Sequence, residues 1–182
     1  MHSNKTRDLC FIGVFVAMII GVSQIPPIPL PGGVPITLQT FIIPLAGAVL
    51  GAKKGAIAAF IFILLGAIGL PVFHGFSGGI GHILGPTGGF IFSFPLMAFV
   101  VGFGADRWHK IWLALGLIVG VVVNLGLGML WFSFVMEVSL QAAFFAAVAP
   151  FVIIELGKMV GVFVVSLSLR EVLKRGRVLG NF

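Results

Sequence analysis

Charged residues are scarce in this sequence, and only one cysteine is present. Asp, Glu, Lys and Arg make up 9% of the 182 residues, whereas soluble domains carry roughly a quarter. The lone cysteine, Cys10, excludes an internal disulfide and a cysteine-based metal cluster. The histidines have no metal-ligand spacing, so no metal site is predicted; they are His2, His74, His82 and His109.

Long apolar runs take the place of the missing charge, and 59% of the residues are hydrophobic. Six runs are each near the roughly 17–25 residues that a transmembrane helix requires. We therefore predict an all-α integral membrane protein whose six transmembrane helices form one compact bundle, a single domain over residues 1–182. The second run is the weakest, because it contains Thr37, Gln39, Thr40 and Pro44. The expected spans are about 9–25, 36–52, 55–73, 88–105, 111–132 and 150–170.

Basic residues fall almost entirely on one side of this arrangement. The connections between spans one and two, three and four, and five and six contain no Lys or Arg. This asymmetry follows the positive-inside rule and predicts that both termini are cytoplasmic. The net charge of +6 then reflects orientation in a lipid bilayer, and no nucleic-acid partner is expected. Of the eleven basic residues only Lys158 lies elsewhere; the other ten are Lys5, Arg7, Lys53, Lys54, Arg107, Lys110, Arg170, Lys174, Arg175 and Arg177.

Two of the outer connections have unusual compositions. The first has five prolines within residues 26–35, and the second has seven glycines between residues 75 and 89. Irregular backbone at membrane depth is tolerated where it is buried in protein or lines a cavity. Because both connections are largely apolar, we expect them to fold back over the bundle and cap a ligand pocket. A pair of flexible surface loops is the alternative.

Small residues recur at fourfold spacing on two of the predicted helices, a pattern that lets helix backbones approach closely in lipid. On the first helix they form either an internal packing seam or a docking face for another membrane protein. The first stripe is Gly13, Ala17 and Gly21, and the stripe on the fifth helix is Gly116, Gly120, Asn124 and Gly128.

Glu155 and Lys158 lie three residues apart inside an apolar run, which places both on one helix face. Lys158 is about 18 Å from the cytoplasmic end near Arg170, at 1.5 Å per residue. An isolated lysine near the bilayer centre costs about 2.5–3.5 kcal/mol. Intramembrane ionisable groups of this kind indicate a polar site, here one open to the outside; a structural ion pair is the alternative.

Four further polar residues are candidates for ligand contact. Asn124, in the middle of helix five, suits either an interhelical hydrogen bond or a ligand. Gln39 lies one turn into helix two, where a solvated helix end is the alternative. Thr87 and His74 lie on the glycine-rich connection, where a plain loop role is the alternative.

Two short motifs suggest enzymes but lack the necessary context. The stretch GGIGHILG has Leu84 where a dinucleotide-binding loop requires its third glycine. The stretch GFSGG around Ser77 matches the serine-nucleophile pattern, and six spans with such a motif resemble rhomboid proteases. No histidine follows His109, so Ser77 has no plausible base, and we do not expect an enzyme.

Four longer motifs occur in order along the chain: GGVPITLQTF (32–41), GAIGLPVF (66–73), GPTGGF (85–90) and PFVIIELGK (150–158). Together they resemble the BioY family, the biotin-specific substrate-binding component of energy-coupling factor transporters. The resemblance covers roughly residues 10–170. Any one of these motifs alone would be weak evidence, but four in register are a specific signal.

The resemblance implies a six-helix protein of a bacterial or archaeal cell membrane, with a biotin pocket near the outer face. It implies partnership with a transmembrane coupling subunit and two ATP-binding subunits, which would use the ATP, and no cofactor in this chain. Such components dock through a small-residue stripe on the first helix, which Gly13, Ala17 and Gly21 match. A related component for riboflavin or thiamin is the closest alternative.

The family's acidic residue and lysine in helix six correspond to Glu155 and Lys158, and its helix-five asparagine corresponds to Asn124. We expect the ureido head of biotin to enter first. Glu155 would accept its N–H groups, Lys158 would donate to its oxygen, and Asn124 would complete the polar set. The acid is usually Asp in the family, and the GPTGG motif is usually followed by Tyr rather than Phe90.

The rest of biotin would lie nearer the mouth of the pocket. Phe73 is expected to enclose the rings, and the carboxylate would meet His74, Thr87 or backbone amides of residues 85–89. The reversed pose, with Lys158 on the carboxylate, is the alternative. His74 itself departs from the family pattern, in which a small or polar residue is expected after LPVF.

Overall fold

The computed structural model describes residues 2–30, 32–107 and 109–175. Arg177, one of the predicted cytoplasmic residues, lies outside these ranges, and the side chains of His2, Lys174 and Arg175 are not described. The described residues form eight helices and no strand beyond two isolated bridges. The helices are α1 (His2–Ser23), α2 (Gln39–Leu50), α3 (Ala52–Ala67), α4 (Ile80–Leu84), α5 (Gly88–Ala105), α6 (Lys110–Val135), α7 (Leu140–Ala147) and α8 (Val152–Arg175).

Four of these helices are long and apolar enough to cross a bilayer: α1, α5, α6 and α8. They coincide with the predicted spans 9–25, 88–105, 111–132 and 150–170 to within a few residues at most ends. The first begins earlier and the last ends later than predicted. This agreement follows from long and mainly apolar sequence, which must form internally hydrogen-bonded helices in lipid.

The two remaining predicted spans are shorter than expected. The predicted span 36–52 contains the 12-residue helix α2, about 18 Å long at 1.5 Å per residue. The predicted span 55–73 becomes the 16-residue helix α3, and residues 68–79 form a loop. Lys53 and Lys54 lie in the first turn of α3 rather than in a connection.

Gly51 alone separates α2 from α3. Its φ of 85° is left-handed, and a Cβ there would lie 2.6 Å from an Asp106 carboxylate oxygen. The other oxygen of that carboxylate accepts a 3.0 Å hydrogen bond from the backbone N–H of Ala52. Glycine is the residue that permits both the conformation and the close approach. The turn between α2 and α3 is thereby fixed against the end of α5.

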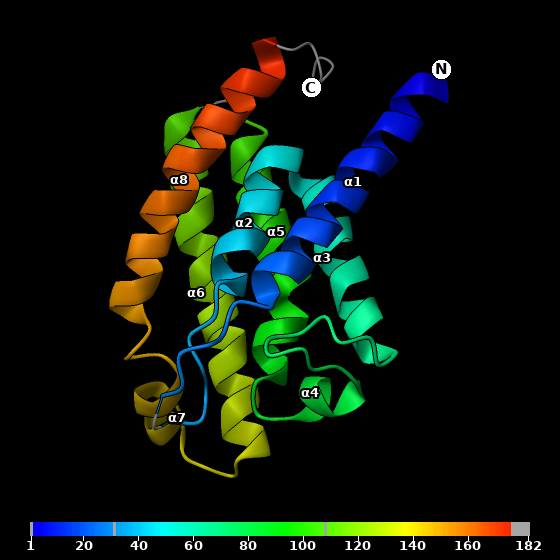
Figure 1. Ribbon diagram of the computed structural model, residues 1–182. Helices are drawn as coiled ribbons and strands as arrows, with labels where there is room; N and C mark the ends of the chain where they lie inside the picture. The colour runs from blue at the N-terminus through cyan, green and yellow to red at the C-terminus, as the bar shows by residue number, and fades with distance from the viewer. Residues whose placement is uncertain (1, 31, 108, 176–182) are drawn as a thin grey trace.

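Figure 1 shows how the ends of the helices are distributed. Both ends of the described chain lie at the top, together with the α2–α3 and α5–α6 turns. The connection from α1 to α2, the short helix α4 and the short helix α7 lie at the bottom. Neither α4 nor α7 was predicted; α4 lies in the glycine-rich connection that was expected to be irregular, and α7 lies in the connection between the fifth and sixth predicted spans. α2 lies in the middle of the bundle, and most of its residues are buried.

The two small-residue stripes behave differently. On α6, a Cβ at Gly128 would contact the ring of Phe90, and one at Gly120 would lie 2.8 Å from Val101, so this stripe is an internal seam against α5. On α1, a Cβ at Gly13 or Gly21 meets nothing within 4 Å. The α1 stripe therefore faces away from the bundle.

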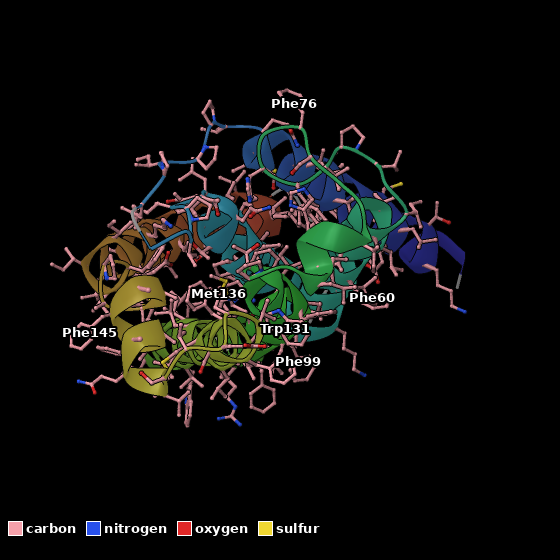
Figure 2. All side chains as sticks on the ribbon, turned by 90° about the horizontal axis from the view of Figure 1, so that it is seen from below. Phe60, Phe76, Phe99, Trp131, Met136 and Phe145 are labelled. Carbon is pink, nitrogen blue, oxygen red and sulfur yellow. The ribbon has the colours of Figure 1, made fainter. Side chains whose placement is uncertain are left out.

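The outside of the bundle is apolar. Figure 2 looks onto the end that carries α4 and α7, and the labelled Phe60, Phe99 and Phe145 point away from the helices. All three are exposed, as are many Leu, Ile and Val side chains on every long helix. An exterior this apolar would aggregate in water and suits contact with lipid.

Candidate functional site

A pocket opens between the first turns of α2, α5 and α8 and the middle of α6. The space between its atoms, open solvent included, is about 510 Å³. Its walls come from four helices and from both unusual connections, so segments far apart in the sequence meet here. The lining residues are Val34, Pro35, Thr37, Gln39, Thr40, His74, Thr87, Phe90, Ile91, Phe94, Asn124, Leu125, Phe151 and Glu155.

Glu155 brings a carboxylate into this largely apolar space from the first turn of α8. The residue is 2% exposed. Its Oε1 accepts hydrogen bonds from the Thr40 hydroxyl and from Lys158 Nζ, both at 2.7 Å. Its Oε2 is buried and has no hydrogen-bond partner among the described residues. A buried charged oxygen without a donor is costly, so Glu155 has an unused acceptor available to a ligand.

Lys158 does not line the pocket. Its ammonium group donates to the carbonyl of Thr37 at 2.8 Å, to the Thr40 hydroxyl at 2.8 Å and to Glu155 at 2.7 Å. An ammonium group has three N–H donors, so protein atoms use all of them. The sequence left two interpretations of Glu155 and Lys158 open, a polar site and a structural ion pair, and the structure has features of both. Lys158 forms the ion pair with Glu155, and the carboxylate of Glu155 lines the pocket.

Gln39 is buried at the start of α2 rather than solvated, with 3% of its surface exposed. Its Oε1 accepts from the Thr37 hydroxyl at 3.3 Å. Its Nε2 is buried without a hydrogen-bond partner among the described residues. The amide therefore offers an unused donor in the same pocket where Glu155 offers an unused acceptor.

Asn124 makes the interhelical hydrogen bonds that were one of the two roles left open by the sequence. Its Nδ2 donates to the backbone carbonyl of Phe90 at 3.0 Å and to the Ser93 hydroxyl at 2.6 Å, which ties α6 to α5. The residue also lines the pocket. With both amide protons donated to protein, its carbonyl oxygen is the group left for a ligand.

The two predicted loop contacts, His74 and Thr87, both lie in the pocket lining. Phe73 does not, and its predicted role as a wall of the pocket is wrong for this structure. Its ring is fully buried in the core, 5.5 Å from the ring of Phe62 and against Gly66. Because Gly66 has no side chain, the ring of Phe73 fits against it. Phe73 therefore anchors the loop instead of lining the pocket.

Ser77, the serine of the protease-like motif, is a turn residue. Its hydroxyl donates to the carbonyl of His74 at 2.7 Å. The backbone N–H of Phe73 in turn donates to the carbonyl of Ser77 at 2.9 Å. The hydroxyl therefore closes a tight turn and stabilises the loop that carries His74.

The sequence reasoning missed two polar residues of the site. Thr40 lies between Lys158 and Glu155, accepting from one and donating to the other. Ser93 holds the amide of Asn124. Thr40 belongs to the motif GGVPITLQTF, but its polarity weakened the second predicted span instead of marking a site. Nothing in the sequence around Ser93 distinguishes it from an ordinary helix serine.

Three comparisons relate this chain to known proteins. A family model described as the BioY family matches residues 1–175. A probable biotin transporter BioY from Pyrococcus horikoshii is 39% identical over 85% of this chain and 90% of the relative. The biotin transporter BioY of Thermotoga maritima is 38% identical over 91% of this chain and 96% of the relative. A crystal structure of the S-component for biotin from an ECF-type ABC transporter superposes with a TM-score of 0.86, at 29% identity over 94% of each chain.

Proposed function

Because this chain belongs to the BioY family, we propose that it binds biotin as the substrate-specific component of an energy-coupling factor transporter. Relatives named as biotin transporters match most of its length, and so does a solved biotin S-component. The family is one of transporters and not of enzymes, in keeping with the structural role of Ser77.

One observation in this chain's own structure carries the proposal: the pocket contains unused hydrogen-bonding atoms that complement a ureido group. A ureido group has one carbonyl acceptor between two N–H donors. The pocket offers the Gln39 Nε2 donor, the Glu155 Oε2 acceptor and the carbonyl oxygen of Asn124. The buried ends of Gln39 and Glu155 gain partners when such a ligand enters, which favours tight and selective binding.

The head-first pose follows, with a changed role for Lys158. Gln39, rather than Lys158, donates to the ureido oxygen, and Glu155 and Asn124 accept from its nitrogens. Lys158 pairs with the Glu155 carboxylate from behind and orients it. The valerate chain then runs along the apolar walls toward the loops, and the carboxylate reaches the side of His74 and Thr87.

Equilibrium binding of labelled biotin to the purified, detergent-solubilised protein tests this function. We expect saturable binding that unlabelled biotin displaces and that riboflavin and thiamin do not. An analogue methylated on both ureido nitrogens should bind at least about tenfold more weakly, since it leaves Glu155 Oε2 unpaired. Displacement by riboflavin or thiamin at biotin-like concentrations would contradict the assignment.

We also propose that all six of the longer helices cross the cell membrane, with both termini in the cytoplasm. Four of them are long enough alone. Apart from Lys158, the described basic residues lie toward the end of the bundle that holds both ends of the described chain, in keeping with the positive-inside rule.

A Cys10→Ala protein with one new cysteine tests this orientation in the membrane. Ser77→Cys should react with a membrane-impermeant maleimide from outside, and Lys110→Cys should not.

The partners belong to the same proposal. Gly13, Ala17 and Gly21 are exposed along α1, where a helix of a transmembrane coupling subunit could approach closely. Two ATP-binding subunits would complete the transporter and use the ATP. This chain then needs no cofactor of its own.

A further inference from the structure

Two histidines lie side by side where the second unusual connection meets the pocket. His74 is half-buried and lines the pocket directly. Its ring lies 6.1 Å from that of His82 on α4, nearly perpendicular to it. The His82 ring also lies 5.9 Å from the ring of Phe73, which is anchored in the core. His74 is thus the pocket-facing member of an ordered aromatic cluster.

The loop that carries His74 is built to hold it in place. Ser77 bonds the His74 carbonyl, and Gly75 and Phe76 take left-handed conformations that close the turn. Gln24, at the end of α1, donates to the carbonyl of Val72 at 3.1 Å and accepts from the N–H of Phe76 at 3.0 Å. Phe76 itself projects outward (Figure 2). These contacts fix the backbone on both sides of His74, while its ring has no recorded hydrogen bond among the described residues.

Little other charge faces His74. Glu155 is the one other ionisable side chain in the described lining of the pocket, and its charge is neutralised by Lys158. His82 is the ionisable neighbour on α4. An anionic group that enters this side of the pocket therefore meets an imidazole as its nearest source of positive charge.

We propose that His74 is the recognition residue for the ligand carboxylate and takes up a proton as that carboxylate binds, with His82 as the residue that positions and tunes it. This inference rests on the proposed function, since it assumes an anionic ligand whose head lies at Glu155. It adds a pH dependence and a specificity determinant that the binding of the ureido head does not require.

The sign of the effect follows from the surroundings of His74. Burial, and secondarily the neighbouring His82, lower the pKa of His74 from its ordinary value, so its ring is neutral at pH 7 without ligand. A bound carboxylate favours the charged imidazolium and raises that pKa. Affinity therefore rises as pH falls through the interval between the bound and free pKa values and levels off below the free value. Carboxylates stay ionised above about pH 5, so the ligand itself does not change.

Titration calorimetry at pH 8, 7 and 6 tests the proposal, using biotin and biotin methyl ester on the intact detergent-solubilised protein. Biotin should bind more tightly at lower pH, by at most about tenfold per pH unit for one proton. Repeating the titration in buffers of different ionisation enthalpy should show proton uptake. The ester should show neither effect. Binding of biotin without pH dependence or proton uptake overturns this inference and leaves the proposed function standing. Absence of biotin binding at every pH overturns both.

Variants separate recognition from structure. His74→Ala should abolish the pH dependence and weaken binding at pH 6 by about tenfold, the loss of one charge-assisted hydrogen bond. His82→Phe keeps an aromatic ring against Phe73 but removes the ionisable neighbour, so the rise in affinity should begin at higher pH. His109→Ala, at the opposite end of the bundle, is the matched control and should keep the wild-type profile. A wild-type profile in His74→Ala would overturn the inference, because another group would then take up the proton; pH-independent binding of undiminished affinity would instead assign the carboxylate to Thr87 or to backbone amides.

Discussion

At the scale of single residues, the site depends on which polar atoms the protein has already used. Lys158 is the most conspicuous residue in the sequence, yet all three of its donors are bound to protein. Gln39 and Glu155 are less conspicuous but retain buried atoms without partners. Unused atoms of this kind cost folding free energy in the empty protein and recover it when a complementary ligand binds.

Gln39→Leu tests the unused donor. The variant removes a buried, unpaired amide nitrogen and leaves a side chain of similar size, so the ligand-free protein should be as stable as the wild type or more stable. Biotin should bind about tenfold to a hundredfold more weakly, because its ureido oxygen is left without a donor. Thermal unfolding with and without biotin measures both effects. A variant with unchanged affinity would remove Gln39 from the site.

Lys158→Met tests the supporting role of the ion pair. It leaves the Glu155 carboxylate buried without its cation, and breaking such a pair costs about 3–5 kcal/mol. We expect a lower unfolding temperature and loss of biotin binding. The double variant Glu155→Gln with Lys158→Met should recover much of the stability, since no charge remains buried, and still bind weakly. Wild-type affinity in Lys158→Met would show that the cation is dispensable.

At the scale of helices, the glycines of α6 determine how closely α5 and α6 pack. Gly128 lies against the ring of Phe90, and Phe90 lines the pocket. The packing seam and the binding site therefore share a side chain. Close approach between these two helices also brings Asn124 within hydrogen-bonding distance of the carbonyl of Phe90.

Gly128→Ala should disturb the site through this seam. The new methyl group would displace the Phe90 ring, so we expect lower thermal stability and weaker biotin binding. Gly126→Ala is the matched control on the same helix, because a Cβ there meets nothing within 4 Å. That control should be neutral or slightly stabilising, since alanine is favoured over glycine in a helix by about 1 kcal/mol. Equal effects of the two substitutions would contradict a packing role specific to Gly128.

At the scale of the whole molecule, the apolar runs predict the four long helices well, because each of these helices is long and has a high mean hydropathy despite a few polar residues. They predict α2 and α3 poorly. The run 36–52 is apolar enough to suggest a full span, but α2 begins at Gln39 and lasts 12 residues. Its polar residues belong to a buried site, and burial of this kind depends on tertiary contacts that hydropathy does not report.

In the candidate site, too, some features could be predicted from the sequence and others depend on tertiary contacts. The sequence predicted Glu155, Asn124, Gln39, His74 and Thr87 as site residues, and the structure gathers all five around one pocket. Their hydrogen-bond partners were not predictable, because Thr40 and Ser93 acquire their roles only through contacts between separate helices. For the same reason the inward orientation of Phe73 depends on the space beside Gly66.

We expect assembly with the proposed coupling subunit to depend on the outer face of α1 and not on the pocket. Ala17 is exposed between Gly13 and Gly21, whose surroundings are open, so a tryptophan at position 17 fits the isolated chain. Ala17→Trp should fold and bind biotin normally, yet fail to co-purify with the coupling and ATP-binding subunits, because the bulky ring prevents close helix approach. Val160→Trp, on the exposed face of α8, is the control and should assemble. Co-purification of the Ala17→Trp protein in wild-type amounts would place the docking face elsewhere on the bundle.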